Sequence, residues 1–297
     1  MPSSRSETDA AEPERALPPL RDVIARHGLT ARKGLGQHFL LDLNLTRRIA
    51  RAAGDLTGHC VIEIGPGPGG LTRALLEAQP DRVIAIEKDR RAIAALEELQ
   101  AVWPNRLEIV EGDALEIDVV QLAGAPRKIV ANLPYNISTA LLARWLPQLT
   151  AFESLTLMFQ KEVAERLVAR PGGRDYGRLS VATQWRANVR RLFDVPAQAF
   201  TPPPKIVSTV ISIEPRAEPL FPADPDQLER VVAAAFGQRR KMLRQALRSL
   251  GPDAESLLAA AGIDPTARAE TLSIEAFCTL ARAFSERNGS TAPRAAP

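Results

Sequence analysis

Three glycines and a distant carboxylate have the types and spacing of a nucleotide-binding loop. Gly65, Gly67 and Gly70 follow the apolar run 61–64 and match the pattern G-x-G-x-x-G. Glycine is needed in such a loop because a side chain would block the approach of a ligand to the backbone. Glu87 lies 20 residues beyond Gly67, where its carboxylate can accept hydrogen bonds from ribose hydroxyls. The pattern predicts a nucleoside cofactor; the alternative is a tight turn without a ligand.

Two further carboxylates favour S-adenosylmethionine over NAD as that cofactor. Glu63 stands two residues before the first glycine, where its charge would attract a sulfonium or ammonium and repel a pyrophosphate. Asp113 follows a third apolar run, 107–110, and can accept a hydrogen bond from an adenine amino group. Taken alone, Asp113 also fits the N-cap of a helix. NAD therefore stays open at this point.

The tetrapeptide Asn132, Leu133, Pro134 and Tyr135 follows a fourth apolar run and resembles the N/D-P-P-Y motif of methyltransferases that act on base amines. The N6 lone pair of adenine is delocalised into the ring and is a poor nucleophile. An Asn oxygen and a backbone carbonyl held rigid beside Pro can accept both N6 hydrogens, which favours a tetrahedral nitrogen. Tyr135 can stack on the base. An ordinary loop with a core Tyr is the alternative.

The elements that must position these residues alternate between short apolar runs and longer helical patterns, which predicts an α/β fold with a doubly wound parallel sheet. Pro202-Pro203-Pro204 precedes a last strand at 207–213, which is expected to be antiparallel. The predicted parallel strands are 61–64, 82–86, 107–110, 127–131 and 154–159, and the predicted helices between them are 71–78, 90–100 and 139–146.

Four prolines between 215 and 225 form a predicted linker to a small all-α domain. Its helices are expected at 225–236, 239–250, 253–261 and 273–287. Within the second, Arg240, Arg244 and Arg248 are spaced i, i+4, i+8 and would share one face, with Lys241 beside them. Such a stripe suits phosphate contacts on RNA, and a solvated helix face is the alternative. The predicted domains are 21–215 and 216–287, with disordered tails at 1–20 and 288–297.

Composition excludes several classes of protein. The 297 residues include only two cysteines and three histidines, which argues against a disulfide scaffold or a metal site and fits a reducing cytoplasm. No apolar run approaches the roughly 18 residues of a membrane span, so no membrane partner is expected. The net charge of +3 is too small to indicate a nucleic-acid partner by itself.

Five motifs in order make the chain similar to one family. They are Gly34-Leu-Gly36-Gln37-His38-Phe39-Leu40, Glu63-Ile-Gly65-Pro-Gly67-Pro-Gly69, Asn132-Leu-Pro-Tyr-Asn136-Ile-Ser138, Phe159-Gln160-Lys161-Glu162-Val163-Ala164-Glu165-Arg166 and Phe200-Thr-Pro-Pro-Pro204-Lys205-Ile-Val-Ser208. Together they resemble the small-subunit ribosomal RNA adenine dimethyltransferases, over about residues 20–287. At His38 many family members carry Asn; His can still donate a hydrogen bond.

The resemblance implies a Rossmann-like class I methyltransferase domain with a small all-α C-terminal domain. The implied reaction moves four methyl groups from S-adenosylmethionine to N6 of two adjacent adenosines, in a hairpin loop near the 3′ end of 16S rRNA. The expected partner is the small ribosomal subunit or its precursor, and the protein is expected to be a cytoplasmic monomer.

The same resemblance assigns site residues by motif. A cofactor site would be lined by His38, Leu40, Gly65, Gly67, Glu87, Asp113 and Asn132. A catalytic loop would consist of Asn132, Leu133, Pro134 and Tyr135, with Phe200 flanking the target base opposite Tyr135. RNA would contact Arg240, Lys241, Arg244 and Arg248.

Three other functions stay open on the sequence. A DNA adenine methyltransferase is disfavoured by the helical domain and the lack of a long recognition insertion. A non-catalytic ribosome-assembly factor with the same fold is disfavoured by the intact loop from Asn132 to Tyr135. An NAD oxidoreductase shares only the glycine loop and Glu87.

Overall fold

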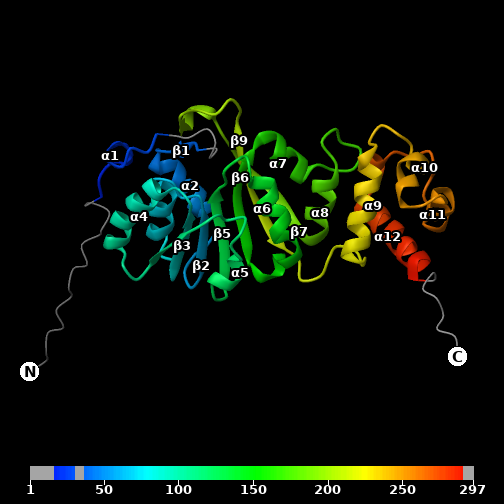
Figure 1. Ribbon diagram of the computed structural model, residues 1–297, viewed down its shortest axis with the longest axis horizontal. Helices are drawn as coiled ribbons and strands as arrows, with labels where there is room; N and C mark the ends of the chain where they lie inside the picture. Colours follow the sequence, from blue (N-terminus) through cyan, green and yellow to red (C-terminus); the bar gives the residue numbers. More distant parts are fainter. Residues whose placement is uncertain (1–16, 31–36, 290–297) are drawn as a thin grey trace, which may run out of the picture.

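The computed structural model describes residues 17–30 and 37–289, and it is built around a seven-stranded sheet (Figure 1). The strand order is β4-β3-β2-β5-β6-β9-β7. The five strands β2 to β6 pair in parallel, whereas β9 pairs antiparallel with β6 and β7. This confirms the doubly wound α/β sheet and its antiparallel last strand. The strands are β2 (Cys60–Ile64), β3 (Arg82–Glu87), β4 (Leu107–Glu111), β5 (Arg127–Asn132), β6 (Ser154–Gln160), β7 (Ala187–Val195) and β9 (Ser208–Pro215).

Helices cover both faces of the sheet, because successive strand residues point to opposite sides. Ile62 packs into a core cluster with α6 and α7, whereas its neighbour Val61 packs into a second cluster with α2, α3 and α4. Burial on both faces explains why these strands read as continuous apolar runs rather than as alternating ones. The helices are α2 (Leu43–Ala52), α3 (Gly70–Glu77), α4 (Arg90–Val102), α5 (Val119–Leu122), α6 (Ser138–Trp145), α7 (Lys161–Val168) and the 3₁₀ helices η3 (Leu146–Ala151) and η4 (Ala197–Ala199).

Several elements were not predicted. Strand β7 lies at the sheet edge and carries the partly exposed Arg190 and Arg191, so its sequence lacks an apolar run. Helix α2 has a signal that could have revealed it, since Asp42 caps the first turn by accepting from the Asn44 and Leu45 amides. Two-residue strands β1 (Phe39–Leu40) and β8 (Phe200–Thr201) pair antiparallel across a long sequence separation.

The predicted helix at 239–250 is wrong over its first four residues, and the rest is not one continuous α-helix. The chain instead turns after α9 (Pro225–Gly237) and forms only the short α10 (Leu243–Ala246) and the 3₁₀ helix η5 (Leu247–Leu250). Met242 has extended backbone angles and forms a β-bridge with Arg268, while the Leu243 and Arg244 amides donate to carbonyls of the 265–267 loop. These tertiary hydrogen bonds replace the helical ones that the local sequence favours.

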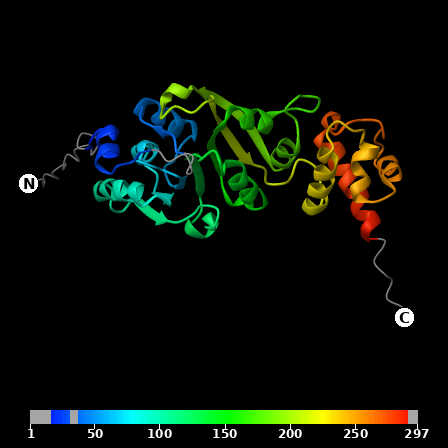
Figure 2. The same ribbon diagram turned by 45° about the horizontal axis from the view of Figure 1, so that its top comes forward.

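The remaining helices form the C-terminal end of the molecule, beyond the sheet edge (Figures 1 and 2). Their shared core takes in Tyr176, Val181 and Trp185, which belong to α8 (Arg178–Arg186) or to the segment before it. This core therefore reaches across the predicted domain boundary at 215/216. The C-terminal elements are α11 (Ala254–Ala260), the 3₁₀ helix η6 (Ala269–Thr271) and α12 (Ile274–Gly289).

The helical structure extends slightly into both predicted tails, 1–20 and 288–297. Helix α1 (Leu20–Arg26) starts at a buried Leu20, and α12 continues to Gly289. Most of both predicted tails, residues 1–16 and 290–297, lies outside the described residues. The same is true of residues 31–36, which include the first three residues of the motif at 34–40. No helix in the described residues is long and apolar enough to cross a membrane.

Candidate active site

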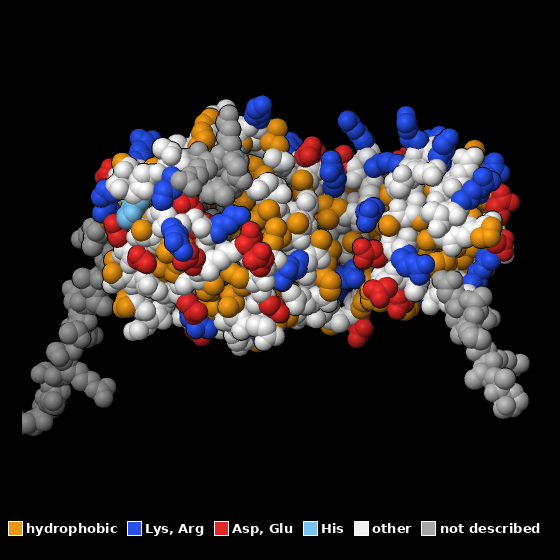
Figure 3. Space-filling model, viewed as in Figure 1, with side chains coloured by type: hydrophobic (Ala, Val, Ile, Leu, Met, Phe, Trp, Pro, Cys, Tyr) orange, Lys and Arg blue, Asp and Glu red, His pale blue; other side chains and the backbone are white. Residues whose placement is uncertain are grey.

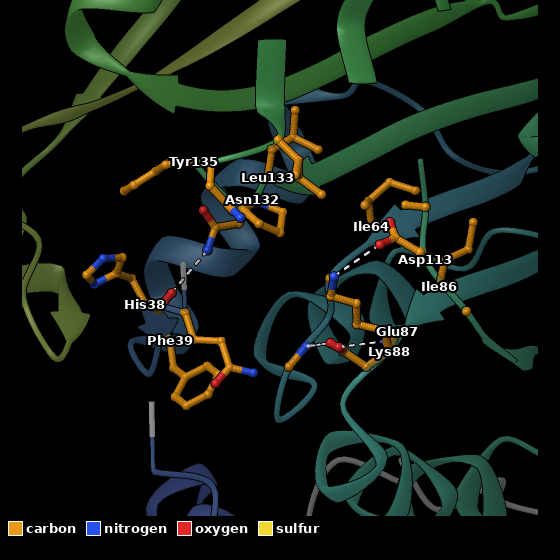
Figure 4. A pocket seen from close by; sticks show the side chains of 18 residues that line it. His38, Phe39, Ile64, Ile86, Glu87, Lys88, Asp113, Asn132, Leu133 and Tyr135 are labelled. Atoms are coloured by element: carbon orange, nitrogen blue, oxygen red, sulfur yellow. Dashed lines mark hydrogen bonds and ion pairs between the residues drawn. The ribbon is translucent and has the colours of Figure 1, made fainter. Parts of the chain in front are cut away.

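A pocket lies at the carboxyl ends of β2, β3, β4 and β5 (Figure 4). Strand β2 neighbours both β3 and β5 in the sheet, so the strand order reverses there. Ligands of open α/β sheets bind at such reversal points, outside the carboxyl ends of the strands. The lining residues are Gln37, His38, Phe39, Ile64, Gly65, Gly67, Ile86, Glu87, Lys88, Gly112, Asp113, Ala114, Asn132, Leu133, Pro134, Tyr135, Asn136 and Ile137.

The glycine loop joins β2 to α3 and forms one wall. Gly67 has φ +56°, and a Cβ added to it would lie 3.0 Å from the Phe39 ring. A Cβ on Gly70 would lie 2.5 Å from the Leu40 carbonyl oxygen, so α3 and β1 are in direct backbone contact. The glycines are thus required both for the turn and for the packing of β1 against α3.

Glu87 ends β3 and is 8% exposed. Its Oε2 accepts from the Gly67 amide at 3.1 Å, and its Oε1 accepts from the Lys88 and Asp89 amides at 2.9 Å each. Burial raises the pKa of Glu87, and these three amides oppose the shift by stabilising the anion. The carboxyl is therefore fixed in orientation beside the loop and retains acceptor capacity toward the pocket.

Asp113 and Lys88 face each other across the pocket, as Figure 4 shows. Lys88 Nζ lies 3.1 Å from Asp113 Oδ2, and Asp113 Oδ1 accepts from the Leu115 amide at 3.0 Å. The Leu115 amide and Lys88 lower the pKa of Asp113. Asp113 thus lines the pocket and also caps a turn. A contact to the cofactor and a capping role, the two interpretations of this residue from the sequence, are therefore compatible.

Asn132 is the last residue of β5. Its Nδ2 donates to the His38 carbonyl oxygen at 3.3 Å, which fixes the plane of the amide (Figure 4). The His38 ring in turn donates from Nδ1 to the Pro202 carbonyl at 2.8 Å. The segment before β1 and the segment after β8 are therefore both tied to the catalytic-loop candidate.

An aromatic row lies beside Asn132. The rings of His38 and Tyr135 stack at 5.6 Å with an interplanar angle of 29°, and the His38 ring meets that of Phe200 edge-on at 6.4 Å. The Tyr135 hydroxyl and Ser208 Oγ are 2.5 Å apart. Burial raises the pKa of Tyr135, so this phenol stays neutral across the physiological range.

The structure brings most of the predicted site residues together. His38, Gly65, Gly67, Glu87, Asp113 and the loop from Asn132 to Tyr135 all line the pocket. Two predicted residues do not line it. Phe200 is 2% exposed and packs in the core, where its ring meets that of His38 edge-on; Leu40 is buried and lines a smaller neighbouring cavity.

Several lining residues were not predicted, among them Phe39, Ile86, Lys88 and Ala114. Each is a direct sequence neighbour of a predicted residue: Phe39 follows His38, Ile86 and Lys88 flank Glu87, and Ala114 follows Asp113. Adjacency to a predicted contact at a strand end is therefore the signal that could have found them.

The family follows from a comparison with known proteins. The model of the family described as ribosomal RNA adenine dimethylase matches residues 28–286. This chain belongs to the ribosomal RNA adenine dimethylase family. The match spans the glycine loop, the Asn132–Tyr135 loop and the C-terminal helices, so it includes both the pocket and the helical end.

Individual dimethylases are similar over nearly the whole chain. The "Ribosomal RNA small subunit methyltransferase A" of Rhodospirillum rubrum is 65% identical over 274 residues, which cover 92% of this chain and 95% of that relative. The protein of the same name from Paramagnetospirillum magneticum is 66% identical, covering 91% of this chain and 96% of that relative. A crystal structure of a dimethyladenosine transferase from Plasmodium falciparum has a TM-score of 0.74 at 26% identity, covering 84% of this chain and 98% of that one. This confirms the class I methyltransferase fold with C-terminal helices.

The four basic residues predicted to contact RNA lie in the C-terminal part of this dimethylase, away from the pocket. Arg240, Lys241 and Arg248 are exposed, and Arg244 is half-buried. Arg240 and Lys241 precede α10, while Arg248 lies in η5, so the residues do not form a stripe on one continuous helix. Figure 3 shows Lys and Arg side chains projecting along the upper edge over these helices.

Proposed function

We propose that this protein transfers methyl groups from S-adenosylmethionine to N6 of two adjacent adenosines, in a hairpin loop near the 3′ end of 16S rRNA. The substrate would be the small ribosomal subunit or its precursor. The observation that carries the proposal is the position of Asn132: it ends β5 at the pocket, next to Tyr135, with its amide already oriented by His38.

The residues of the pocket fit the cofactor. Gly65 and Gly67 line the pocket with the loop backbone, Glu87 would supply an acceptor for ribose hydroxyls, and Asp113 would supply one for an adenine amino group. Glu63 is 2% exposed and its Oε2 has no hydrogen-bond partner, which leaves a buried acidic group near the loop for a cationic ligand. A pyrophosphate, as in NAD, would meet this buried acid instead of a basic group.

The chain's own residues would prepare the nitrogen for attack. S-adenosylmethionine, when bound, supplies a methyl group on a positively charged sulfur. Because Asn132 Nδ2 donates to His38, its Oδ1 is left to accept one N6 hydrogen. The Leu133 carbonyl, held beside Pro134, would accept the other, so the nitrogen becomes tetrahedral and its lone pair is freed.

The balance of the reaction needs no general base at the start. The new N–C bond forms as the S–C bond breaks, and the bonding pair leaves with the sulfur. The methylated nitrogen carries a positive charge and then loses its proton to water. The neutral Tyr135 would contribute its ring face to hold the base rather than a charge.

RNA binding is proposed for residues 216–287, and catalysis for residues 21–215. Exposed arginines and a lysine at the helical end would contact RNA phosphates. Phosphate contacts do not depend on the base sequence, so this kind of binding fits an RNA partner that is recognised by its shape. Both cysteines are buried free thiols, which supports action in the reducing cytoplasm. We propose that the protein acts as a monomer, with both regions in the same chain.

The test is methylation of small subunits that lack the modification. Subunits are incubated with the protein and isotopically labelled S-adenosylmethionine, and rRNA fragments are analysed by mass spectrometry. Two neighbouring N6,N6-dimethyladenosines near the 3′ end are expected. Asn132→Ala should reduce product formation by about 10²–10³-fold, as removal of one preorganised polar partner does. Asn188→Ala, on the exposed part of β7, is the matched control.

The same assay separates the alternatives. Labelled duplex DNA instead of rRNA would indicate a DNA adenine methyltransferase. Binding to subunits without any methyl transfer would indicate an assembly factor. Binding of NAD but not of S-adenosylmethionine would contradict the proposal at the cofactor.

A further inference from the structure

Glu63 is an acidic residue placed inside the sheet. All five residues of β2 are buried, and Glu63 is 2% exposed. Its neighbours Ile62 and Ile64 face the core cluster of α6 and α7, so alternation directs Glu63 to the opposite face, where α3 packs. A carboxylate in such a position is costly unless it is paired.

No partner compensates this carboxyl in the described residues. Oε2 of Glu63 makes no hydrogen bond, and neither does the nearby Thr72 hydroxyl on α3. Burial raises the pKa of Glu63 to about 8; the nearby Thr72 hydroxyl opposes the shift, and the negative charge of Glu87 adds to it. At neutral pH this raised pKa favours the protonated form of Glu63 in the free protein.

The charged surroundings are few. Glu87 on β3 is the acidic neighbour, and the His38 ring lies on the β1 side of the same cavity. On α3 the next charged residue is Arg73, whose Nη1 donates to the Pro18 carbonyl at 2.8 Å. The neighbour on β5 is the uncharged Asn132. Among the described residues, then, no cation replaces the proton of Glu63.

The cavity that Glu63 lines adjoins the main pocket at the end where Asn132 lies. The two cavities share His38, Phe39, Gly65 and Asn132. The acceptors proposed for the adenosine portion, Glu87 and Asp113, line the main pocket only. The opposite end, toward Asn132, is where the sulfonium and the amino acid portion of the cofactor would lie, since the methyl group must reach the base there.

We propose that Glu63 determines specificity for the cationic end of the cofactor, being neutral in the free protein and ionising when that end binds, with release of one proton to solvent. This rests on the proposed function, because it takes the ligand to be S-adenosylmethionine. The carboxyl O–H bond breaks, the proton passes to the buffer, and the positive charge of the ligand takes its place. The desolvated anion then has the partner that the free protein lacks.

Calorimetry tests the proton. S-adenosylmethionine is titrated into the protein at pH 7 in buffers of different ionisation enthalpy, and the slope of the binding heat gives the protons released. Wild-type protein should release close to one. Glu63→Gln is nearly isosteric with the protonated acid and cannot ionise, so it should bind more weakly and release none. Glu111→Gln, which changes an exposed acid at the end of β4, should keep the release because β3 separates β4 from the strand of Glu63.

The pH dependence of affinity gives an independent number. Between pH 6 and pH 7, wild-type affinity should rise about tenfold, because one proton leaves for each ligand bound. The gain should end near pH 8, where Glu63 is ionised beforehand and the ligand's own α-amino group begins to lose its proton. Glu63→Gln should show a flat profile. A profile that persists in Glu63→Gln would overturn the proposal.

Adenosine supplies the control for the cationic end. It carries the base and ribose but no sulfonium or ammonium, so its binding should release no proton. Binding of S-adenosylmethionine without any buffer dependence would refute the role of Glu63 and leave the proposed function standing. Failure of S-adenosylmethionine to bind the wild-type protein at all would refute the proposed function itself.

Stability provides a readout without a ligand. The folded pKa of Glu63 is about 8 and its ordinary value is 4.5, so the folded state binds the extra proton between these values. Wild-type stability should therefore fall, through this group, as the pH rises from about 4.5 to about 8. Urea unfolding of Glu63→Gln should lack this component. Equal pH profiles for the two proteins would contradict a buried neutral acid.

Discussion

The side chains of the pocket are positioned by their own contacts before a ligand arrives. Asn132 is held by the His38 carbonyl, Glu87 by three backbone amides, and Tyr135 by Ser208. Groups fixed in this way need little reorganisation when charge develops in the reaction. We therefore expect single substitutions here to affect binding or turnover more than stability.

Glu87 should be the main determinant of ribose binding. Glu87→Ala removes the charged acceptor and should weaken S-adenosylmethionine binding by about 1–3 kcal/mol, the usual cost of losing a hydrogen bond to a charged group. Calorimetric titration measures this difference directly. Glu111→Ala, which removes an exposed carboxylate at the end of β4, should leave the affinity unchanged. Equal losses in the two variants would mean that a general charge effect, not the ribose contact, is measured.

Tyr135 should act through its ring. Tyr135→Ala should reduce base capture, because stacking contributes about 1–3 kcal/mol per base. Tyr135→Phe keeps the ring and loses only the bond to Ser208, so its turnover should fall mildly. Single-turnover methylation of assembled subunits measures both effects.

Ser208→Ala is the matched control for the hydroxyl. It breaks the same hydrogen bond as Tyr135→Phe, and the double variant should be no worse than either single one. If Tyr135→Phe is as inactive as Tyr135→Ala, the hydroxyl has a chemical role and stacking does not explain the residue.

At the level of elements, the site depends on the close packing of β1 on α3. The Leu40 carbonyl lies against Gly70, the first residue of α3. Strand β1 pairs with β8, which places the His38 and Phe200 rings within 6.4 Å of each other. A shift of β1 would therefore move the carbonyl that orients Asn132.

Gly70→Ala tests this packing. The new Cβ would lie 2.5 Å from the Leu40 oxygen, a backbone atom that cannot move alone, and overpacking of this kind costs about 1–3 kcal/mol. Gly237→Ala is the control, because nothing lies within 4 Å of its Cβ in α9 and alanine favours a helix by up to about 1 kcal/mol. Urea unfolding should show a loss for the first variant only. A neutral Gly70→Ala would mean that β1 moves away from α3 without cost.

On the scale of the whole molecule, catalysis and the proposed RNA contacts lie in different parts. The pocket is at the carboxyl ends of the parallel strands β2 to β5, and the exposed basic residues lie beyond the edge strand β7, on the C-terminal elements (Figures 1 and 3). Phosphate contacts at a distance from the reacting base can fix the orientation of a large RNA without reading its sequence.

Charge reversal should separate the two parts. Changing Arg240, Arg244 and Arg248 together to Glu should weaken subunit binding and reduce its salt dependence, because fewer counterions are released. The slope of log affinity against log salt concentration should fall by about one for each phosphate that a reversed side chain no longer neutralises. S-adenosylmethionine affinity should not change. Binding measured across a salt series checks this.

The control reverses the same number of charges elsewhere. Arg21, Arg51 and Arg90 are exposed and belong to helices α1, α2 and α4 at the other end of the molecule. Their reversal should have a smaller effect on subunit binding. Equal effects of the two triple variants would mean that Arg240, Arg244 and Arg248 are ordinary solvated residues without a specific role in subunit binding.

The sequence by itself determined the parallel sheet and half of the residues that line the pocket. The strands at 61–64, 82–86 and 127–131 could be predicted because burial on both faces leaves largely continuous apolar runs. The strand at 107–110 lies at the sheet edge and is only partly buried. Gly67, Glu87 and Asn132 could be located because each stands at the end of such a run. The roles given to these residues remain predictions until the variants are measured.

Only the tertiary structure decided what depends on contacts between distant segments. The helix predicted at 239–250 is interrupted because Met242 forms a β-bridge with Arg268 and the Leu243 amide donates to the Ala267 carbonyl. The edge strand β7 forms because β9 supplies its partner, although its own sequence is half polar. The buried state of Phe200 follows from the pairing of β8 with β1. Local sequence reports burial and propensity, whereas these features depend on backbone hydrogen bonds between segments that no local pattern encodes.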